Sequence, residues 1–182
     1  MLLIHLQLVI INLNFFEMKI LICGLPGSGK TWLAERLVQH VKNCAWYNAD
    51  ILRSSSNDWD FSPEGRRRQA NRMRTFADFE VSNNRWVVCD FVAPTKESRT
   101  LFSPDYVIWL DTVKEGRVVD TKKEELKDAR ELPFEVDTLA TTKEFEDTNK
   151  VFDPPDNANQ RITSFLSDDE IQKLATEILD SV

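Results

Sequence analysis

The sequence predicts an α/β domain in which helices cover both faces of a parallel β-sheet. Apolar, strand-like runs alternate with helix-like stretches between residues 18 and 110. The first run leads through a glycine-rich turn directly into a helix, and the run RWVVCDFV at 85–92 is almost wholly apolar, as strands buried on both faces are. This alternating order predicts a ligand crevice at the carboxyl ends of the strands.

The individual elements follow from the spacing of apolar residues and from residues that start helices. The expected strands are 18–23, 44–48, 85–92 and 105–111, and the expected helices are 30–41, a short turn from 49, 62–83, 95–102 and 167–179. Ser62 is a candidate N-cap with Pro63 at the first helical position. Ser167 and Glu170 have the spacing of a capping box, so the last helix is expected to serve packing.

Composition limits the class of protein. The 182 residues are 42% hydrophobic and 29% charged, which is typical of a soluble globular chain. The net charge of −7 argues against a duplex nucleic acid as partner, because such a partner needs a broad basic face. Cys23, Cys44 and Cys89 lie in apolar runs without CxxC spacing, so we expect reduced, buried thiols and a cytoplasmic location.

Two segments differ from the rest of the chain. The apolar residues 1–17 lack the basic start and cleavage site of a signal peptide, and polar residues interrupt them too often for a membrane span. We expect them to be a dispensable extension upstream of a start at Met18, with 18–182 forming a single domain. Between 112 and 155 charge rises and apolar periodicity is lost, which indicates helix and loop without defined bounds and fits a lid over the crevice and a solvated surface insertion equally well.

The segment GLPGSGKT matches the phosphate-binding pattern G-x-x-x-x-G-K-[ST] between a strand and a helix. In this pattern the glycines let backbone N–H groups surround phosphates, the lysine reaches the β- and γ-phosphate oxygens, and the threonine offers a hydroxyl to Mg²⁺. The residues expected to bind ATP are Gly24, Leu25, Pro26, Gly27, Ser28, Gly29, Lys30 and Thr31. Since no guanine-reading N-K-x-D sequence occurs, a small-molecule kinase that uses ATP and Mg²⁺ is favoured.

Two aspartates at strand ends are candidates for the acceptor and metal sites. A kinase needs a carboxylate to orient the acceptor hydroxyl or take its proton. Asp50 follows the strand 44–48, although capping of the next helical turn explains it equally well. Asp90 has the hhhhD form of a Walker B strand end, which favours Mg²⁺ over a structural role. The expected catalytic residues are therefore Lys30, Asp50 and Asp90, with Thr31 and Asp90 on the metal.

Cationic and aromatic residues follow between the second and third strands. Arg53 lies one helical turn after Asp50, so both are expected on the same side. Arg66 begins a run of three arginines in the first turns of the long helix, where the helix dipole disfavours cations, which favours anion binding by Arg66. The two arginines after it fit a solvated charge run. Phe61 either stacks on a base or fills the core.

Four segments, GLPGSGKT, NADILR, DFSPEGRRRQ and FVAP, resemble in order and spacing the motifs GxSGSGKT, DGDNxR, GFSxxxRxxN and FISP of adenylylsulfate kinases. The resemblance covers about residues 18–110. It implies a P-loop nucleoside-kinase-like three-layer fold, a homodimer, and transfer of the ATP γ-phosphoryl group to the 3′-hydroxyl of adenylyl sulfate with Mg²⁺.

The resemblance also implies an acceptor site. Phe61 matches the adenine-stacking phenylalanine, Arg66 the sulfonucleotide-binding arginine, and Gln69 stands in place of the family's asparagine. The substrate-binding residues implied in this way are Asp50, Arg53, Phe61, Arg66, Gln69, Val92 and Ala93.

The sequence departs from the family pattern at three places. Asn48 replaces the first aspartate of DGD, and Asp90 precedes FVAP where the family has a small residue, as if a carboxylate had moved between neighbouring strand ends. The lid signature RDxKGLY is missing, and the residues available to stand in for it are Arg117, Lys122 and Lys123.

Three functions remain open on this basis. The first is adenylylsulfate kinase activity, which Phe61 and Arg66 favour. The second is the same chemistry on a nucleoside, a modified nucleotide or a polynucleotide end, which Asn48 and the altered lid favour. The third is a nucleotide-binding protein without turnover, against which the joint presence of Lys30, Asp50 and Asp90 argues.

Overall fold

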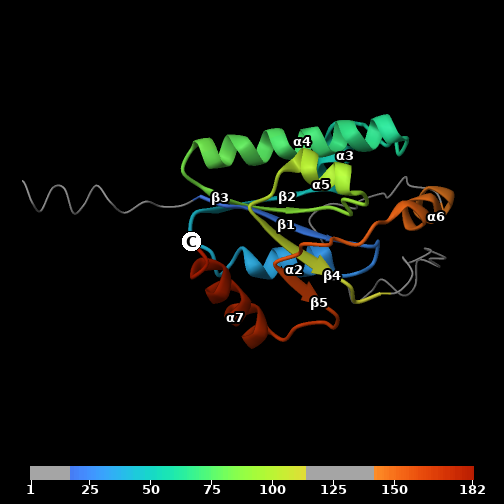
Figure 1. The fold of residues 1–182 in the computed structure, drawn as a ribbon. Helices are drawn as coiled ribbons and strands as arrows, with labels where there is room; N and C mark the ends of the chain where they lie inside the picture. The colour runs from blue at the N-terminus through green and yellow to red at the C-terminus, as the bar shows by residue number, and fades with distance from the viewer. Residues whose placement is uncertain (1–16, 114–141) are drawn as a thin grey trace, which may run out of the picture.

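The computed structural model describes residues 17–113 and 142–182. A five-stranded parallel sheet, in the order β2-β3-β1-β4-β5, lies between two layers of helices (Figure 1). The strands are β1 Lys19–Gly24, β2 Cys44–Asn48, β3 Trp86–Asp90, β4 Tyr106–Leu110 and β5 Gln160–Ile162. The helices are α2 Lys30–Leu37, α3 Ala49–Ser55, α4 Pro63–Ser82, α5 Lys96–Phe102, α6 Thr142–Val151 and α7 Asp168–Leu179. The three-layer fold class predicted from the sequence is confirmed.

The alternation of side chains along β1 builds a separate core on each face of the sheet. Ile20 and Ile22 pack with residues of α2 and α7, whereas Leu21 and Cys23 pack with residues of α4 and α5. Figure 1 shows α4 on one side of the sheet and α2 with α7 on the other. Because β1 is buried on both faces, its run is apolar without interruption.

Several helix starts agree with the capping predictions. Ser62 Oγ accepts a hydrogen bond from the Gly65 N–H at 3.1 Å, and Pro63 is the first residue of α4. Ser167 and Glu170 form the expected capping box of α7, whose apolar face joins the core. These local signals therefore fixed the beginnings of the two longest helices that were predicted.

Other boundaries differ from the expectation. The helix expected at 30–41 ends at Leu37, yet Val41 is still buried in the same core. Helix was expected within the 112–155 region without defined bounds, and α6 lies there, whereas β5 was not predicted, because its three residues are too few for a periodic pattern. The extension at 1–16 and most of the 112–155 region, including Arg117, Lys122 and Lys123, lie outside the described residues.

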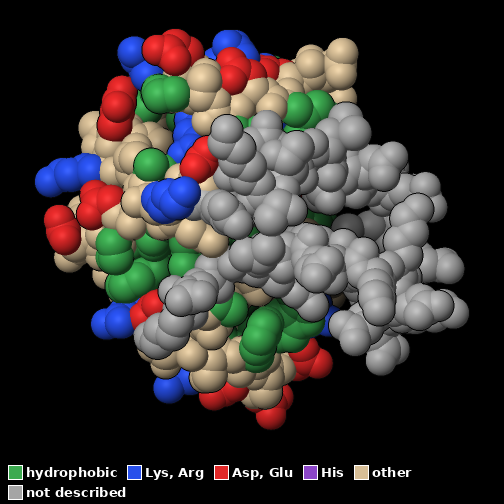
Figure 2. Space-filling model, turned by 90° about the vertical axis from the view of Figure 1, so that its right-hand side faces the viewer, with side chains coloured by type: hydrophobic (Ala, Val, Ile, Leu, Met, Phe, Trp, Pro, Cys, Tyr) green, Lys and Arg blue, Asp and Glu red, His purple; other side chains and the backbone are tan. Residues whose placement is uncertain are grey.

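The carboxyl ends of the strands point toward the side of the molecule on which α6 lies (Figure 1). In the view of that side, acidic and basic side chains of the described residues are interspersed (Figure 2). Within 17–113 and 142–182, no helix is both long enough and apolar enough to span a bilayer.

Candidate active site

The glycine-rich loop bends sharply between β1 and α2. Gly24 has φ of 151°, and a Cβ there would lie 2.5 Å from the Leu110 backbone oxygen, so a larger residue does not fit. Gly29 is the N-cap of α2 in a left-handed conformation, and no side chain caps this helix, unlike α3, α4, α5 and α7. The first N–H groups of α2 are thus available to an anion.

A cavity of about 490 Å³, here the inner cavity, opens in front of this loop. Most of the predicted site residues line it; these are Pro26, Gly27, Gly29, Lys30, Thr31, Asp50, Arg53, Phe61, Arg66, Gln69, Asp90, Val92 and Ala93. Gly24, Leu25 and Ser28 do not line it and instead shape the loop from behind. The Leu25 carbonyl, for example, accepts a hydrogen bond from Lys30 Nζ at 2.8 Å.

Asp90 lies at the end of β3 and is 2% exposed. Its Oδ2 accepts hydrogen bonds from Thr31 Oγ1 at 2.9 Å and Asn48 Nδ2 at 2.9 Å, and its Oδ1 accepts one from Trp46 Nε1 at 2.7 Å. Burial raises the pKa of Asp90 to about 6, although the bonds from Trp46 and Thr31 and the charge of Lys30 act in the opposite direction.

This pKa predicts how the stability of the nucleotide-free protein depends on pH. The pKa of aspartate is about 3.9 when unfolded, so between about pH 4 and 6 the folded state binds more protons and loses stability as pH rises. Asp90→Asn should remove this contribution, which is at most on the order of 3 kcal/mol. Chemical denaturation from pH 4 to 7 measures it. A difference between wild type and variant that stays constant over this range would contradict the prediction.

Asp50 lies on the wall of the inner cavity, and the residue as a whole is exposed. Desolvation by the surrounding protein raises the pKa of Asp50, while the positive charges of Lys30 and Arg53 act in the opposite direction. The alternative role as an N-cap is wrong for Asp50, because the Asn48 side chain caps α3. Burial lowers the pKa of Lys30, and Asp90 and Asp50 oppose that shift. The inner cavity therefore holds an ammonium group near two carboxylates.

Arg53 is 5% exposed, and its guanidinium group binds partners within the protein. It donates to the backbone oxygens of Asp58 at 2.9 Å and Asp60 at 3.0 Å, and its guanidinium group lies 4.5 Å from the centre of the Phe61 ring. Arg53 therefore lines the inner cavity, but its hydrogen bonds hold the loop at 58–60 in place.

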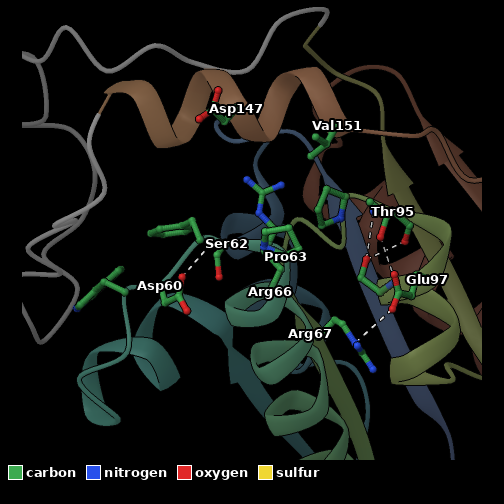
Figure 3. Close-up of a pocket in the computed structure, with 13 residues that line it drawn as sticks. Asp60, Ser62, Pro63, Arg66, Arg67, Thr95, Glu97, Asp147 and Val151 are labelled. Carbon is green, nitrogen blue, oxygen red and sulfur yellow. Dashed lines mark hydrogen bonds and ion pairs between the residues drawn. The ribbon is translucent and has the colours of Figure 1, made fainter.

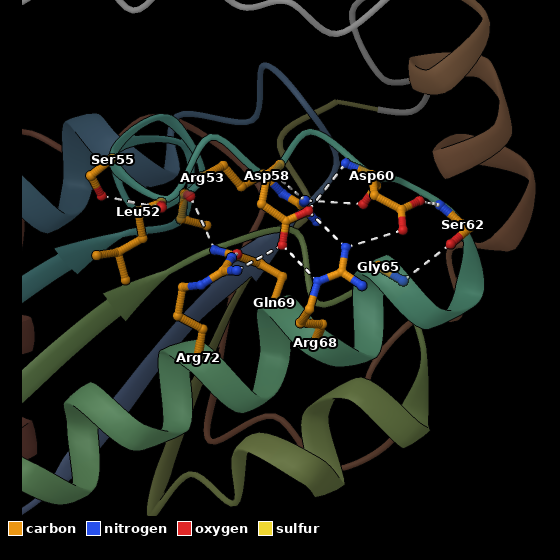
Figure 4. Close-up of polar contacts among 11 residues, drawn as sticks. Leu52, Arg53, Ser55, Asp58, Asp60, Ser62, Gly65, Arg68, Gln69 and Arg72 are labelled. Carbon is orange, nitrogen blue, oxygen red and sulfur yellow. Dashed lines mark hydrogen bonds and ion pairs between the residues drawn. The ribbon is translucent and has the colours of Figure 1, made fainter.

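Two further arginines hold the same loop (Figure 4). Arg68 and Arg72 of α4 both bind the Asp58 carboxylate, and these bonds keep the pKa of Asp58 well below its usual range. The interpretation as a solvated charge run fits both residues, because Arg67 and its partner Glu97 are exposed and Arg68 is exposed as well, although it binds the Asp58 carboxylate.

A second cavity of about 530 Å³, the outer cavity, adjoins the inner one (Figure 3). Phe61 and Arg66 line both cavities, and Trp59 lines the outer one. Phe61 lies outside both hydrophobic cores, so the alternative of a core residue is wrong. Arg66 points from α4 toward α6 and donates to Thr148 Oγ1 at 3.0 Å.

Three residues of the site were missed from the sequence. Trp46 shares a face of β2 with Asn48, and the two-residue period was the signal that could have found it. Trp59 lies two residues before Phe61 in the same loop, and their ring centres lie 6.4 Å apart. Thr148 carried no local signal, since the bounds of α6 were not predicted.

The parallel sheet, the glycine-rich loop and the uncapped helix behind it define a P-loop kinase architecture. The family model for adenylylsulphate kinase matches residues 17–163, and the chain belongs to this family. The resemblance expected from the four motifs is thereby confirmed, and with it membership of a kinase family.

One curated relative has the same family name, and two solved structures share the fold. A probable adenylyl-sulfate kinase of Aeropyrum pernix is 33% identical over 87 residues, which cover 43% of this chain and 45%, less than half, of that relative. The Mycobacterium tuberculosis APS kinase CysC, solved in complex with AMPPNP and APS, has a TM-score of 0.63 and 20% identity, covering 90% of this chain and 96% of that one. A sugar kinase from Janibacter has the same TM-score at 14% identity, covering 90% and 95%. These two structures show the shared fold.

Proposed function

We propose that this chain transfers the γ-phosphoryl group of ATP to the 3′-hydroxyl of adenylyl sulfate. The observation that supports this most directly is that the phosphate loop and the acceptor motifs line one cavity. The family assignment supports the choice of acceptor, as do Phe61 and Arg66 at the spacing of the family motif. We further propose that residues 18–182 form a single domain and that the active protein is a homodimer.

On the donor side, the residues present fit Mg²⁺·ATP. The uncapped start of α2 and Lys30 are proposed to bind the phosphates. Thr31 Oγ1 and Asp90 Oδ2, 2.9 Å apart, offer hard oxygen ligands. Among the described residues, no group of three or more acidic, histidine or cysteine side chains is arranged to hold a metal ion, so the proposed Mg²⁺ would keep water and phosphate ligands. Bound Mg²⁺ supplies positive charge where the transferred group gathers negative charge.

On the acceptor side, Asp50 is proposed to take the proton of the 3′-hydroxyl. The hydroxyl oxygen then forms a bond to the γ-phosphorus while the bond between that phosphorus and the departing ADP oxygen breaks. The raised pKa of Asp50 favours this role. Arg66 is proposed to bind the anionic part of the acceptor and Phe61 to stack on its base. Backbone groups of Val92 and Ala93, which line the cavity, complete the proposed site.

A second candidate keeps the chemistry but changes the acceptor to another hydroxyl-bearing nucleotide, a nucleoside or a polynucleotide end. Arg53 and Gln69 favour it, because both are engaged within the protein. Arg53 holds the loop at 58–60, and Gln69 donates to the Ala49 backbone oxygen at 3.1 Å. They would then contribute to acceptor binding indirectly, Arg53 by holding the loop at 58–60 and Gln69 by holding the start of α3.

The deciding experiment measures ADP release from Mg²⁺·ATP with and without adenylyl sulfate. We expect adenylyl sulfate to stimulate release at least about tenfold and Lys30→Ala to abolish the stimulation, because the phosphates lose their cation. Lys42→Ala is the matched control, since Lys42 is exposed and should leave the rate unchanged. ADP release that other hydroxyl acceptors stimulate, and adenylyl sulfate does not, would favour the second candidate. Nucleotide binding without turnover of any acceptor would favour a nucleotide-binding protein that is not a kinase.

A further inference from the structure

Asn48 makes four hydrogen bonds where the phosphate loop, β3 and α3 meet. Its Nδ2 donates to Thr31 Oγ1 at 3.1 Å and to Asp90 Oδ2 at 2.9 Å. Its Oδ1 accepts from the backbone N–H groups of Asp50 at 2.9 Å and Ile51 at 3.0 Å. A carboxamide has two N–H donors and two acceptor lone pairs, so the hydrogen-bonding capacity of this side chain is fully used.

The partners of Asn48 require an amide. The strand register places residue 48 beside Asp90. An aspartate at 48 could still cap α3, but its second oxygen would face Asp90 Oδ2 as another negatively charged acceptor. Since the backbone N–H groups of α3 need an acceptor and the carboxylate needs a donor, the orientation of the amide follows from its partners.

A second donor from the same strand completes the arrangement. Trp46 lies two residues before Asn48, so both side chains project from one face of β2, and its Nε1 donates to the other Asp90 oxygen at 2.7 Å. Among the ten residues of β2 and β3, Asp90 is the only acid. The two strands thus provide one carboxylate, and each of its oxygens accepts a hydrogen bond from a side chain of β2.

We propose that Asn48 is a positioning residue with two linked tasks. It holds Asp90 beside Thr31 as the single carboxylate of this strand pair, and it fixes the start of α3, and hence Asp50, relative to them. The inference rests on the proposed function for the roles of Asp50 and Asp90. It gives the departure from the DGDNxR pattern a physical purpose, because the carboxylate stands on β3 instead of β2 and the amide on β2 donates to it.

Because residues 48 and 90 are register partners, we expect that swapping their side chains restores the site. We compare wild type, Asn48→Asp, Asp90→Asn and the double variant by calorimetry of ADP binding with and without Mg²⁺, and by the thermal midpoint of the nucleotide-free protein. Each single variant should weaken Mg²⁺-dependent ADP affinity about tenfold, and Asn48→Asp should also lower the midpoint. The double variant should return to within about threefold of wild type. Losses that merely multiply, or tighter binding by Asn48→Asp, would overturn the proposal.

Asn48→Ser separates positioning from capping. Serine is a good N-cap but lacks the two amide donors. α3 should therefore keep its cap, while Mg²⁺-dependent ADP affinity should fall about tenfold and the midpoint should fall because the buried Asp90 carboxylate loses a donor. Wild-type affinity in this variant would mean that Asn48 only caps α3. Both measurements omit the acceptor, so they decide the role of Asn48 even if adenylyl sulfate is not phosphorylated.

Discussion

Asp50→Asn is expected to lower kcat by about 10²- to 10⁴-fold, because the acceptor hydroxyl loses the group proposed to take its proton. Asp50 faces the inner cavity and makes no cap, so the change should leave α3 in place. The measurement is the steady-state rate of ADP release at saturating ATP and acceptor. Calorimetric ADP affinity should stay within about threefold of wild type, since Asp50 is assigned to the acceptor side.

A matched control for this variant is Asp78→Asn. Asp78 lies on α4 and pairs with Lys19 and Arg74, away from the residues that line the inner cavity. It should keep wild-type kcat and lose stability only slightly. If Asp50→Asn retained full turnover, Asp50 would have no part in the transfer. If it instead raised KM alone, Asp50 would bind the acceptor without handling its proton.

The fold was predictable where a local signal was strong. The apolar runs of β1, β3 and β4 had to be strands buried on both faces, and Ser62 and Ser167 marked helix starts by the hydrogen bonds that they accept. The helical spacing of apolar residues up to Val41 correctly indicated that Val41 is buried, but wrongly indicated that it is helical. Burial constrains the direction of a side chain more than it constrains the backbone conformation.

The composition of the site was predictable, but its connections were not. Sequence order does not reveal that β3 lies between β1 and β2, and that neighbourhood is what brings Asn48 and Trp46 onto Asp90. Asn48 was interpreted from the sequence as a lost carboxylate. In the structure, the amide in this position donates a hydrogen bond to the neighbouring carboxylate of Asp90.

The arginine run at 66–68 illustrates the same limit. Successive residues of a helix project about 100° apart, so three adjacent arginines reach three different surroundings. Arg66 lines both cavities, Arg67 pairs with Glu97 on the wall of the outer cavity alone, and Arg68 binds Asp58. The choice of Arg66 as the cavity residue was possible from its place in the motif, whereas the role of Arg68 depended on the fold of the loop before α4.

Gly65→Ala is expected to be the most disruptive single methyl group near the acceptor site. A Cβ at residue 65 would lie 2.2 Å from the Asp60 backbone oxygen and 2.5 Å from its carboxyl carbon. That backbone oxygen accepts the Arg53 hydrogen bond that holds the loop, so neither side can move freely. Overpacking of this kind costs about 1–3 kcal/mol, which corresponds to a fall of roughly 2–12 °C in Tm for a chain of this size.

The same substitution should also weaken acceptor binding, because Phe61 follows Asp60 directly and lies under the Arg53 guanidinium group. We expect KM for the acceptor to rise about tenfold and KM for ATP to change little, since the phosphate loop is carried by other elements. Asn71→Ala adds no atoms at an exposed position of the same helix and should match wild type. An unchanged Tm in Gly65→Ala would show that the loop at 58–61 yields easily. It could then not hold Phe61 in a fixed position for stacking.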